Sequence, residues 1–383
     1  MALRTAVRRL AGAVVSRFSG AVRDATAREE LVKGRATVSG TRRYASRHPT
    51  EFVTFRELRL SRVGLGTSLG SDDAGGQRYR GVAQMALIGG INVIDTAISY
   101  GAQTCERAIG AALRNSIRNG SAARDEIFVV SKCGYLPRAP RGRGANRRFD
   151  PRIDQQQLGL KPGDILLGSH CIAPAFIADQ IARSRRNLGL ATIDLYLLHN
   201  PEVHTASLSK YQFERRMSAA FDALEQACAS GHIGQFGIST WEAFRCTNDA
   251  PAHLSLHRLR SIAADVGGRE NHFAAVQAPY NVMWREIATL RSQRGRNGRA
   301  TLLAAAHAED MLVLTSATLA GGSLAMPGVL SGGSDKALTD AEKAIAFASR
   351  APGITCALVG MGSRSHLTDA LRAVRRRRTA ATQ

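Results

Sequence analysis

The sequence lacks several features that would place it in a specialised class of proteins. No apolar run approaches the roughly 18 residues that a transmembrane helix needs, so no membrane insertion is expected. The six cysteines are scattered and none form a C-x-x-C pair, which argues against a disulfide framework and against a zinc site, so no metal site is predicted. Aromatic residues make up 5% of the 383 residues, so the core must consist mainly of alanine, leucine, valine and isoleucine.

Acidic residues are also scarce, with 31 Asp and Glu against 52 Lys and Arg and a net charge of +21. Residues 1–50 contribute +8 and residues 371–383 contribute +5, so the two ends carry most of the excess. A nucleic-acid surface typically interleaves basic and aromatic residues on one folded face, whereas "RAVRRRR" (372–378) has no aromatic residue. The pattern favours a solvated basic tail over residues 373–383, and nucleic-acid binding is the less favoured alternative.

The first 50 residues have the composition of a leader. No acid precedes Asp24, and apolar residues form a stripe at helical spacing, at Leu3, Val7, Leu10, Val14 and Phe18. An amphipathic, arginine-rich and acid-poor N-terminus is typical of an organelle transit peptide. "TRRYAS" (41–46) also resembles a mitochondrial processing site. We therefore predict that residues 1–50 are a disordered or cleaved leader and that the protein is imported into the mitochondrial matrix, the alternative being a cytoplasmic protein with an uncleaved extension.

Beyond the leader, apolar runs alternate with amphipathic stretches. Eight runs read as strands, at residues 62–67, 91–96, 126–133, 192–200, 233–240, 273–281, 311–317 and 354–361. A polar stretch rich in Arg, Gly and Pro (134–154) reads as a long loop, and no other long polar linker interrupts the alternation. This pattern predicts one parallel α/β domain over residues 51–372, and eight strands is the number of the closed (β/α)8 TIM barrel. An open, doubly wound sheet is the alternative.

Four titratable residues lie at the ends of three successive strands or just after them: Asp95, Tyr100, Lys132 and His199. In parallel barrels these positions share one rim, where catalytic groups lie. A nearby ammonium lowers the pKa of a phenol, an aspartate holds the ammonium in place, and a histidine can hydrogen-bond a substrate oxygen. Together these four residues predict a general acid that protonates a carbonyl oxygen. That oxygen gains negative charge when a cofactor delivers hydride to the carbonyl carbon.

The chain also resembles a known family at a series of landmarks. They are "GLGTSLG", "NVIDTAISYG", "FVVSKCG", "DLYLLHNPE", "GQFGIST", "VQAPYN" and "ALVGMGSRSHLTDAL", in order between residues 60 and 372. These motifs are similar to those of the aldo-keto reductases. The resemblance implies a TIM barrel that binds NADP(H), or NAD(H), across its C-terminal rim. It also implies that Tyr100 is the general acid/base, Lys132 lowers its pKa, Asp95 pairs with Lys132 and His199 orients the carbonyl.

The same resemblance implies a set of cofactor-binding residues: Gly66, Thr67, Ser239, Thr240, Gln277, Gly362, Ser363, Arg364 and Asp369. Arg364 is the candidate for a 2′-phosphate contact and favours NADP(H). The sequence departs from the family where Thr240 replaces the usual asparagine and where Ser316 replaces the aromatic residue that stacks on the nicotinamide.

The expected activity is reversible hydride transfer between the nicotinamide and a small aldehyde, ketone or sugar hydroxyl. The altered segment around Ser316 supports an alternative, a non-catalytic redox sensor that keeps the barrel and the cofactor. The glycines of "GLGTSLG" do not match a Rossmann fingerprint, because no helix follows at once. We expect His204 and Trp284 to pack rather than to line a substrate pocket. The sequence does not indicate the physiological substrate or the oligomeric state.

Overall fold

The computed structural model describes residues 30–68, 73–137, 156–330 and 338–375. Most of the predicted leader (1–29), the arginine-rich part of the predicted loop (138–155) and the end of the predicted basic tail (376–383) lie outside these residues. No helix in the described part of the chain is long and apolar enough to cross a membrane.

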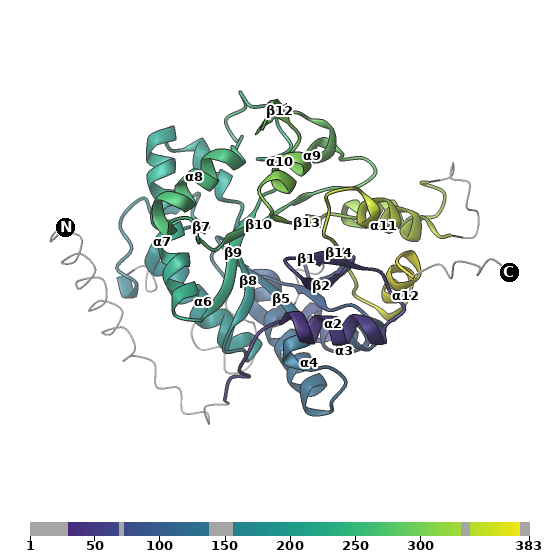
Figure 1. Ribbon diagram of the computed structural model, residues 1–383. Coiled ribbons are helices and arrows are strands. Elements are labelled where there is room, and N and C mark those ends of the chain that lie inside the picture. Colours follow the sequence, from purple (N-terminus) through teal and green to yellow (C-terminus); the bar gives the residue numbers. More distant parts are fainter. Residues whose placement is uncertain (1–29, 69–72, 138–155, 331–337, 376–383) are drawn as a thin grey trace. The chain divides into compact units, whose positions relative to one another are not determined.

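Eight parallel strands close into a barrel in the spatial order β10-β13-β14-β3-β4-β5-β8-β9 (Figure 1). Their bounds are Val63–Gly66 (β3), Val93–Asp95 (β4), Phe128–Cys133 (β5), Ile193–His199 (β8), Ile233–Ser239 (β9), Phe273–Pro279 (β10), Leu312–Ser316 (β13) and Cys356–Gly360 (β14). All eight predicted strands are present, and their ends lie within two residues of the predicted ones. The barrel prediction is confirmed and the open sheet is excluded.

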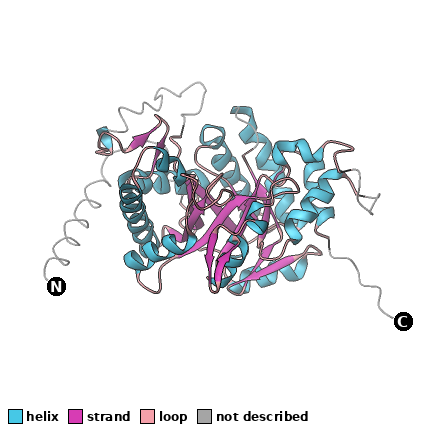
Figure 2. Ribbon diagram, turned by 90° about the horizontal axis from the view of Figure 1, so that it is seen from above, coloured by secondary structure: helices cyan, strands magenta, loops and turns pink. Residues whose placement is uncertain are grey.

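Helices surround the barrel (Figure 2). They are α3 (Asp73–Gly89), α4 (Thr104–Arg118), α6 (Pro174–Leu188), α7 (Lys210–Ala229), α8 (Leu256–Gly267), α10 (Leu302–Ala308), α11 (Asp340–Arg350) and α12 (Arg364–Ala373). In α4, the buried residues Cys105, Ala108, Ile109 and Ala112 recur at the spacing of one helix face. In α7, Ser209 and Gln212 form a capping box that sets where the helix begins.

Apolar residues on alternating strand positions fill two layers. The larger cluster packs strands against helices, and a smaller cluster fills the barrel interior. The interior cluster includes Phe55 and Leu60, which belong to an antiparallel hairpin of β1 (Phe52–Phe55) and β2 (Leu58–Ser61). The hairpin therefore closes the end of the barrel that the strands start from, and leaves the opposite rim open for a site.

The folded part begins before the predicted boundary at residue 51. Helix α2 (Val38–Arg47) packs next to the hairpin, and its Tyr44 is fully buried. Upstream of it, the backbone N–H of Ala36 donates to Asp194 Oδ1 at 2.6 Å. These contacts show that the folded part begins at about residue 31. The "TRRYAS" motif therefore lies inside a packed helix.

Several shorter elements lie in the connections. Strands β6 (Ile165–Leu166) and β7 (His170–Cys171) form a small hairpin in the long loop before α6, and β11 (Gln293–Gly295) and β12 (Gly298–Ala300) form another. Helix α9 (Glu286–Thr289) and the 3-10 helices η2 (Tyr100–Gln103), η3 (Arg124–Glu126), η4 (Pro201–Ala206) and η5 (Ala320–Ala325) complete the described elements.

Candidate active site

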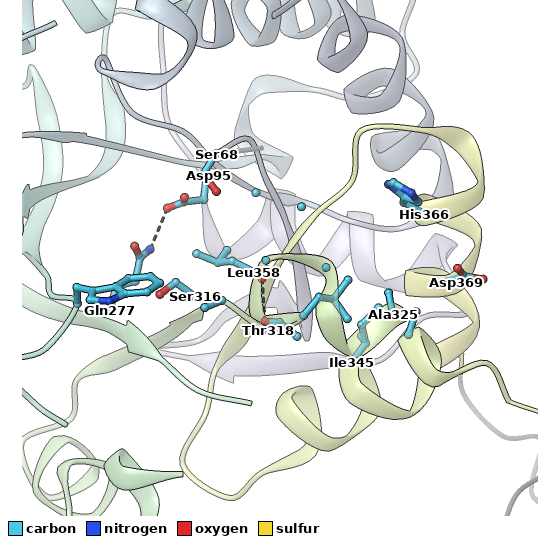
Figure 3. A pocket seen from close by; sticks show the side chains of 18 of the residues that line it. Ser68, Asp95, Gln277, Ser316, Thr318, Ala325, Ile345, Leu358, His366 and Asp369 are labelled. Carbon is cyan, nitrogen blue, oxygen red and sulfur yellow. Dashed lines mark hydrogen bonds between the residues drawn. The ribbon is translucent and has the colours of Figure 1, made fainter. Parts of the chain in front are cut away.

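A cavity of about 860 Å³ lies at the C-terminal rim of the barrel. Its lining includes Asp95, Tyr100, His199, Ser239 and Gln277, which come from four different strands or the loops that follow them. Figure 3 shows Asp95 and Gln277 on one side of the view and the side chains of His366 and Asp369, from α12, on the other. The cavity therefore joins the predicted catalytic residues to the helix after the last strand.

Lys132 lies beneath the cavity and is fully buried. Its Nζ donates to Asp95 Oδ1 at 2.5 Å and to the backbone carbonyl of Thr96 at 2.9 Å. Strands β4 and β5 are neighbours in the barrel, which brings Asp95 at the end of β4 close to Lys132 near the end of β5. Burial is the largest single effect and would lower the pKa of Lys132, but Asp95 and Tyr100 together outweigh it and the net pKa is raised, so the side chain is an ammonium.

Tyr100 lies within reach of this ammonium. The Lys132 Nζ is 3.5 Å from the Tyr100 hydroxyl and 5.0 Å from the centre of its ring. The loop that presents the ring contains three consecutive residues with positive φ, from Gly101 (53°) to Gln103 (72°), and this turn leads directly into α4. The predicted turn at Gly101 and the predicted proximity of the two groups are both present.

Burial and the neighbouring Lys132 have opposite effects on the pKa of Tyr100. Burial raises the pKa of the phenol, and the nearby Lys132 opposes that increase without reversing it, so the net pKa is above its ordinary value. Lys132 therefore acts in the predicted direction, lowering the pKa of Tyr100, and its effect is smaller than that of burial. The phenol is therefore protonated at neutral pH, which is the state that a general acid requires.

His199 is a neutral imidazole that faces the cavity. Burial, followed by the charge of Lys132, holds the pKa of His199 well below its ordinary value. Its Nδ1 is buried and has no partner within the described residues. Because a buried N–H without an acceptor is costly, the proton is better placed on Nε2. The ring meets the Tyr100 ring edge-on, with centroids 5.8 Å apart.

A chain of hydrogen bonds connects Asp95 to two other polar residues of the rim. Gln277 Nε2 donates to Asp95 Oδ2 at 2.9 Å (Figure 3), and Ser239 Oγ donates to Gln277 Oε1 at 2.7 Å. Thr240 is also buried, and its Oγ1 has no partner within the described residues. An unpartnered buried hydroxyl beside an amide and a serine is suited to the amide group of a ligand.

The sequence as a whole matches a known family. Residues 62–331 match the model of the aldo/keto reductase family. The chain belongs to this family. The predicted family is thereby confirmed.

Curated relatives and solved structures agree with this assignment. The chain is 31% identical over 165 residues to D-threo-aldose 1-dehydrogenase of Pseudomonas sp, and this match covers 42% of this chain and 43% of that protein. It is 28% identical over 187 residues to 6-dehydroglucose reductase of Agrobacterium fabrum, with 48% and 52% covered. The chain thus spans about half the length of the curated relatives it matches. An aldo/keto reductase of Klebsiella pneumoniae, solved with NADP and acetate, superposes with a TM-score of 0.55 at 19% identity over 85% of this chain and 90% of that one.

The predicted cofactor residues of this aldo/keto reductase fall into two groups. Gly66, Ser239, Thr240, Gln277 and Asp369 line the cavity. The others lie outside its lining. Thr67 is buried and its hydroxyl donates to the backbone carbonyl of Asp95 at 3.2 Å.

The loop after the last strand holds the rest of the second group. Gly362 and Ser363 precede α12, and the Ser363 hydroxyl accepts from the backbone N–H of His366 as the N-cap of that helix. Arg364 is exposed and does not line the cavity. The structure therefore leaves these three residues beside the cavity rather than in it.

Sequence reasoning did not identify many of the lining residues, among them Ser68, Trp241 and His366. The spacing of His366 and Asp369, three residues apart on one helix face, was an available signal. Ser68 and Trp241 lie in loops after strands, and no periodicity marks them. As expected, His204 packs away from the cavity and is fully buried. Trp284 is also outside the lining, where its ring meets that of Trp241 edge-on.

Proposed function

We propose that this aldo/keto reductase is an NAD(P)(H)-dependent oxidoreductase that transfers hydride reversibly between a nicotinamide and a small carbonyl compound or sugar hydroxyl. The observation that carries the proposal is the buried chain from Asp95 through Lys132 to Tyr100, which ends in the same cavity as His199. The names of the two curated relatives, an aldose dehydrogenase and a dehydroglucose reductase, favour an aldehyde or sugar substrate.

Tyr100 holds the proton that the reaction needs. A nicotinamide bound in the cavity would supply the hydride in reduction and accept it in oxidation. In reduction, the Tyr100 O–H bond breaks and its proton goes to the substrate oxygen, which leaves a phenolate 3.5 Å from the Lys132 ammonium. This ammonium, fixed by Asp95, stabilises the phenolate, so Lys132 acts on the charge that appears during the reaction.

His199 orients the same oxygen. With its proton on Nε2 and its pKa held low, the ring remains a neutral hydrogen-bond donor at physiological pH. It therefore polarises the carbonyl without competing with Tyr100 as an acid. The edge-on contact with the Tyr100 ring holds the two side chains next to each other in the cavity wall.

The residues of the cavity fit a nicotinamide nucleotide. Ser239, Gln277 and the unpartnered hydroxyl of Thr240 would hold the nicotinamide amide. At the other side, His366, Asp369 and the neighbouring loop of Gly362, Ser363 and Arg364 would hold the adenosine end. The basic side chains of Arg364 and His366 at this end favour NADP(H), and NAD(H) is the alternative.

Substitution of Tyr100 by phenylalanine tests the proposed function. General acid catalysis contributes about 10²- to 10⁴-fold, so we expect kcat of Tyr100→Phe to fall by that order. The measurement is NADPH- and NADH-dependent turnover of a panel of aldehydes, ketones and aldoses, with cofactor affinity followed by fluorescence. Tyr211→Phe, at a side chain that is mostly exposed, is the matched control and should behave like the wild type. Equal turnover by Tyr100→Phe and the wild type would contradict the proposal.

Ser316 supports a second candidate, a redox sensor that binds the cofactor without turnover. Ser316 lines the cavity at the end of β13, where the family pattern has an aromatic ring (Figure 3). Tight cofactor binding by the wild type with negligible turnover across the whole panel would favour the sensor.

A further inference from the structure

Two buried histidines lie behind His199 and outside the cavity. His170 Nε2 is 2.6 Å from the backbone carbonyl oxygen of His199, and His170 Nδ1 is 2.9 Å from His204 Nε2. His204 Nδ1 is in turn 3.0 Å from Arg216 Nη1 on α7. Both rings are fully buried, and their centroids are 4.9 Å apart. The four residues form one continuous line of hydrogen bonds from α7 to the end of β8.

The two ends of this line fix the direction of every bond. A guanidinium can only donate, so His204 Nδ1 must accept from Arg216 and carry no proton. His204 then carries its proton on Nε2 and donates it to His170 Nδ1. His170 carries its proton on Nε2, which faces a carbonyl oxygen that can only accept. Both ends therefore require that each ring carries its proton on Nε2. An additional proton on Nδ1 of either ring would bring two N–H groups face to face.

The environment keeps both rings neutral. Burial lowers the pKa of His170 to about 4, and burial together with the charges of His170 and Arg216 lowers the pKa of His204 to about 3. His170 is faced by His199, by Tyr135 and by His204, and His204 is faced by His170 and Arg216. Within the described residues, no carboxylate forms a hydrogen bond with either ring.

Two neighbours show that the contact with His199 is built into the fold. Gly134 has a φ of 153°, and a Cβ there would lie 2.5 Å from the carbonyl oxygen of His199 and 2.7 Å from His170 Nε2. Only glycine leaves room for this bond. The ring of Tyr135 lies edge-on to both His170 (4.9 Å) and His199 (5.1 Å), and its hydroxyl accepts from Asn200 Nδ2 at 2.9 Å.

We propose that Arg216, His204 and His170 are positioning residues that act as a directed relay, which holds the main chain of His199 and thereby the imidazole that orients the substrate carbonyl. The proposal rests on the proposed function for the role of His199. The relay itself can be observed without turnover, because it specifies the tautomers of two rings.

The test compares Arg216→Gln with Arg216→Lys. A glutamine can donate or accept and so does not specify a direction, whereas a lysine can only donate. Arg215→Gln is the control, since Arg215 is the exposed neighbour on the same helix. The first readout is nitrogen NMR of the histidine rings. In the wild type, Arg216→Lys and Arg215→Gln, His170 and His204 should carry their protons on Nε2, and Arg216→Gln should lose this pattern and shift the signals of His199.

The second readout is the pH profile of kcat with the best carbonyl of the panel. Partners that orient metal-bound histidines contribute about 10- to 100-fold to activity, and by analogy Arg216→Gln should lose up to about that much kcat, with KM for the cofactor unchanged. Loss of the Arg216 charge raises the pKa of His204, so the acidic limb of the profile should move to higher pH in Arg216→Gln. Arg216→Lys should restore both.

Two results would overturn the relay. One is a wild-type spectrum with a proton on Nδ1 of His170 or His204. The other is an Arg216→Gln protein whose tautomers and acidic limb are those of the wild type, even if its kcat is uniformly lower. A correct spectrum in a protein without carbonyl turnover would support the relay and contradict the proposed function, so the two failures can be distinguished.

Discussion

Lys132 illustrates how a single buried charge can organise a site. A fully buried ammonium is costly to remove from water, and its cost is offset only when it is paired and hydrogen-bonded. Here Asp95 supplies the opposite charge, and Gln277 and Ser239 in turn fix the carboxylate. The charge that is needed for chemistry is therefore held by residues that also line the cavity.

Removing either member of this ion pair should destabilise the fold. Asp95→Asn and Lys132→Met each leave one buried charge without its partner, which costs about 3–5 kcal/mol. The double variant leaves no uncompensated charge, so its loss of unfolding free energy should be clearly smaller than the sum of the losses of the two single variants. Urea unfolding at pH 7 of the wild type and the three variants measures this coupling. Losses that simply add would show that the two side chains do not interact.

Among the elements, α2 is held to the barrel by two adjacent carboxylates of η3. Asp125 Oδ1 accepts from Arg43 Nη2 at 2.7 Å. Glu126, whose side chain is 1% exposed, accepts from Arg43 Nε at 2.8 Å and from both Arg47 Nη1 and Nη2 at 2.8 Å. Burial would raise the pKa of Glu126, but the bonds from Arg47, from the backbone N–H of Ala123 and from Arg43 outweigh it, and the net pKa is lowered. The helix is thus tied to the strand-start end of the barrel by charged hydrogen bonds.

This arrangement predicts a pH-dependent contribution to stability. A carboxyl whose pKa is lowered by folding stabilises the protein above its unfolded pKa, about 4.5, and that contribution is lost as the pH falls through the folded pKa. Glu126→Gln should therefore lower the free energy of unfolding by about 1–3 kcal/mol at pH 7. Because the wild type loses the contribution of this carboxylate as the pH falls below about 4.5, the difference in stability between the variant and the wild type should shrink progressively in that range. Urea unfolding across this range provides the measurement. Glu57→Gln is the control, because its pair with Arg42 is exposed and should be worth little.

The elements that the sequence predicted are those with a periodic apolar pattern. All eight barrel strands could be located because each is a buried run, and Asp95, Lys132 and His199 could be grouped because strand ends share a rim. Helix α2 was read as leader because its polar surface hides the few residues, such as Tyr44, that it buries. The partners of His199 could not be predicted either. His170 lies in a two-residue strand within a long loop, and only the fold brings it to the end of β8.

At the scale of the whole molecule, the first 50 residues combine a leader-like composition with a folded segment. Residues 1–29 carry the composition of a transit peptide, while residues from Leu31 onward belong to the folded unit. Val32 bridges to Leu190, and Ala36 donates to the buried carboxylate of Asp194. A cut at "TRRYAS" would remove these contacts and divide α2.

We propose that the protein is imported into mitochondria and that processing occurs before Leu31. N-terminal sequencing of the protein purified from isolated mitochondria should give a first residue upstream of that position. In vitro, a chain that begins at Tyr44 should unfold a few degrees below one that begins at Leu31, since an unfolding entropy of about 2.1 cal/mol/K per residue gives a chain of this size a fall in Tm of about 1–2 °C for each lost kcal/mol. Recovery of a stable, active protein that starts at Tyr44 would contradict the role given to residues 31–43, and a full-length protein confined to the cytosol would contradict import. The two outcomes distinguish the targeting signal from the residues that the barrel needs in order to fold.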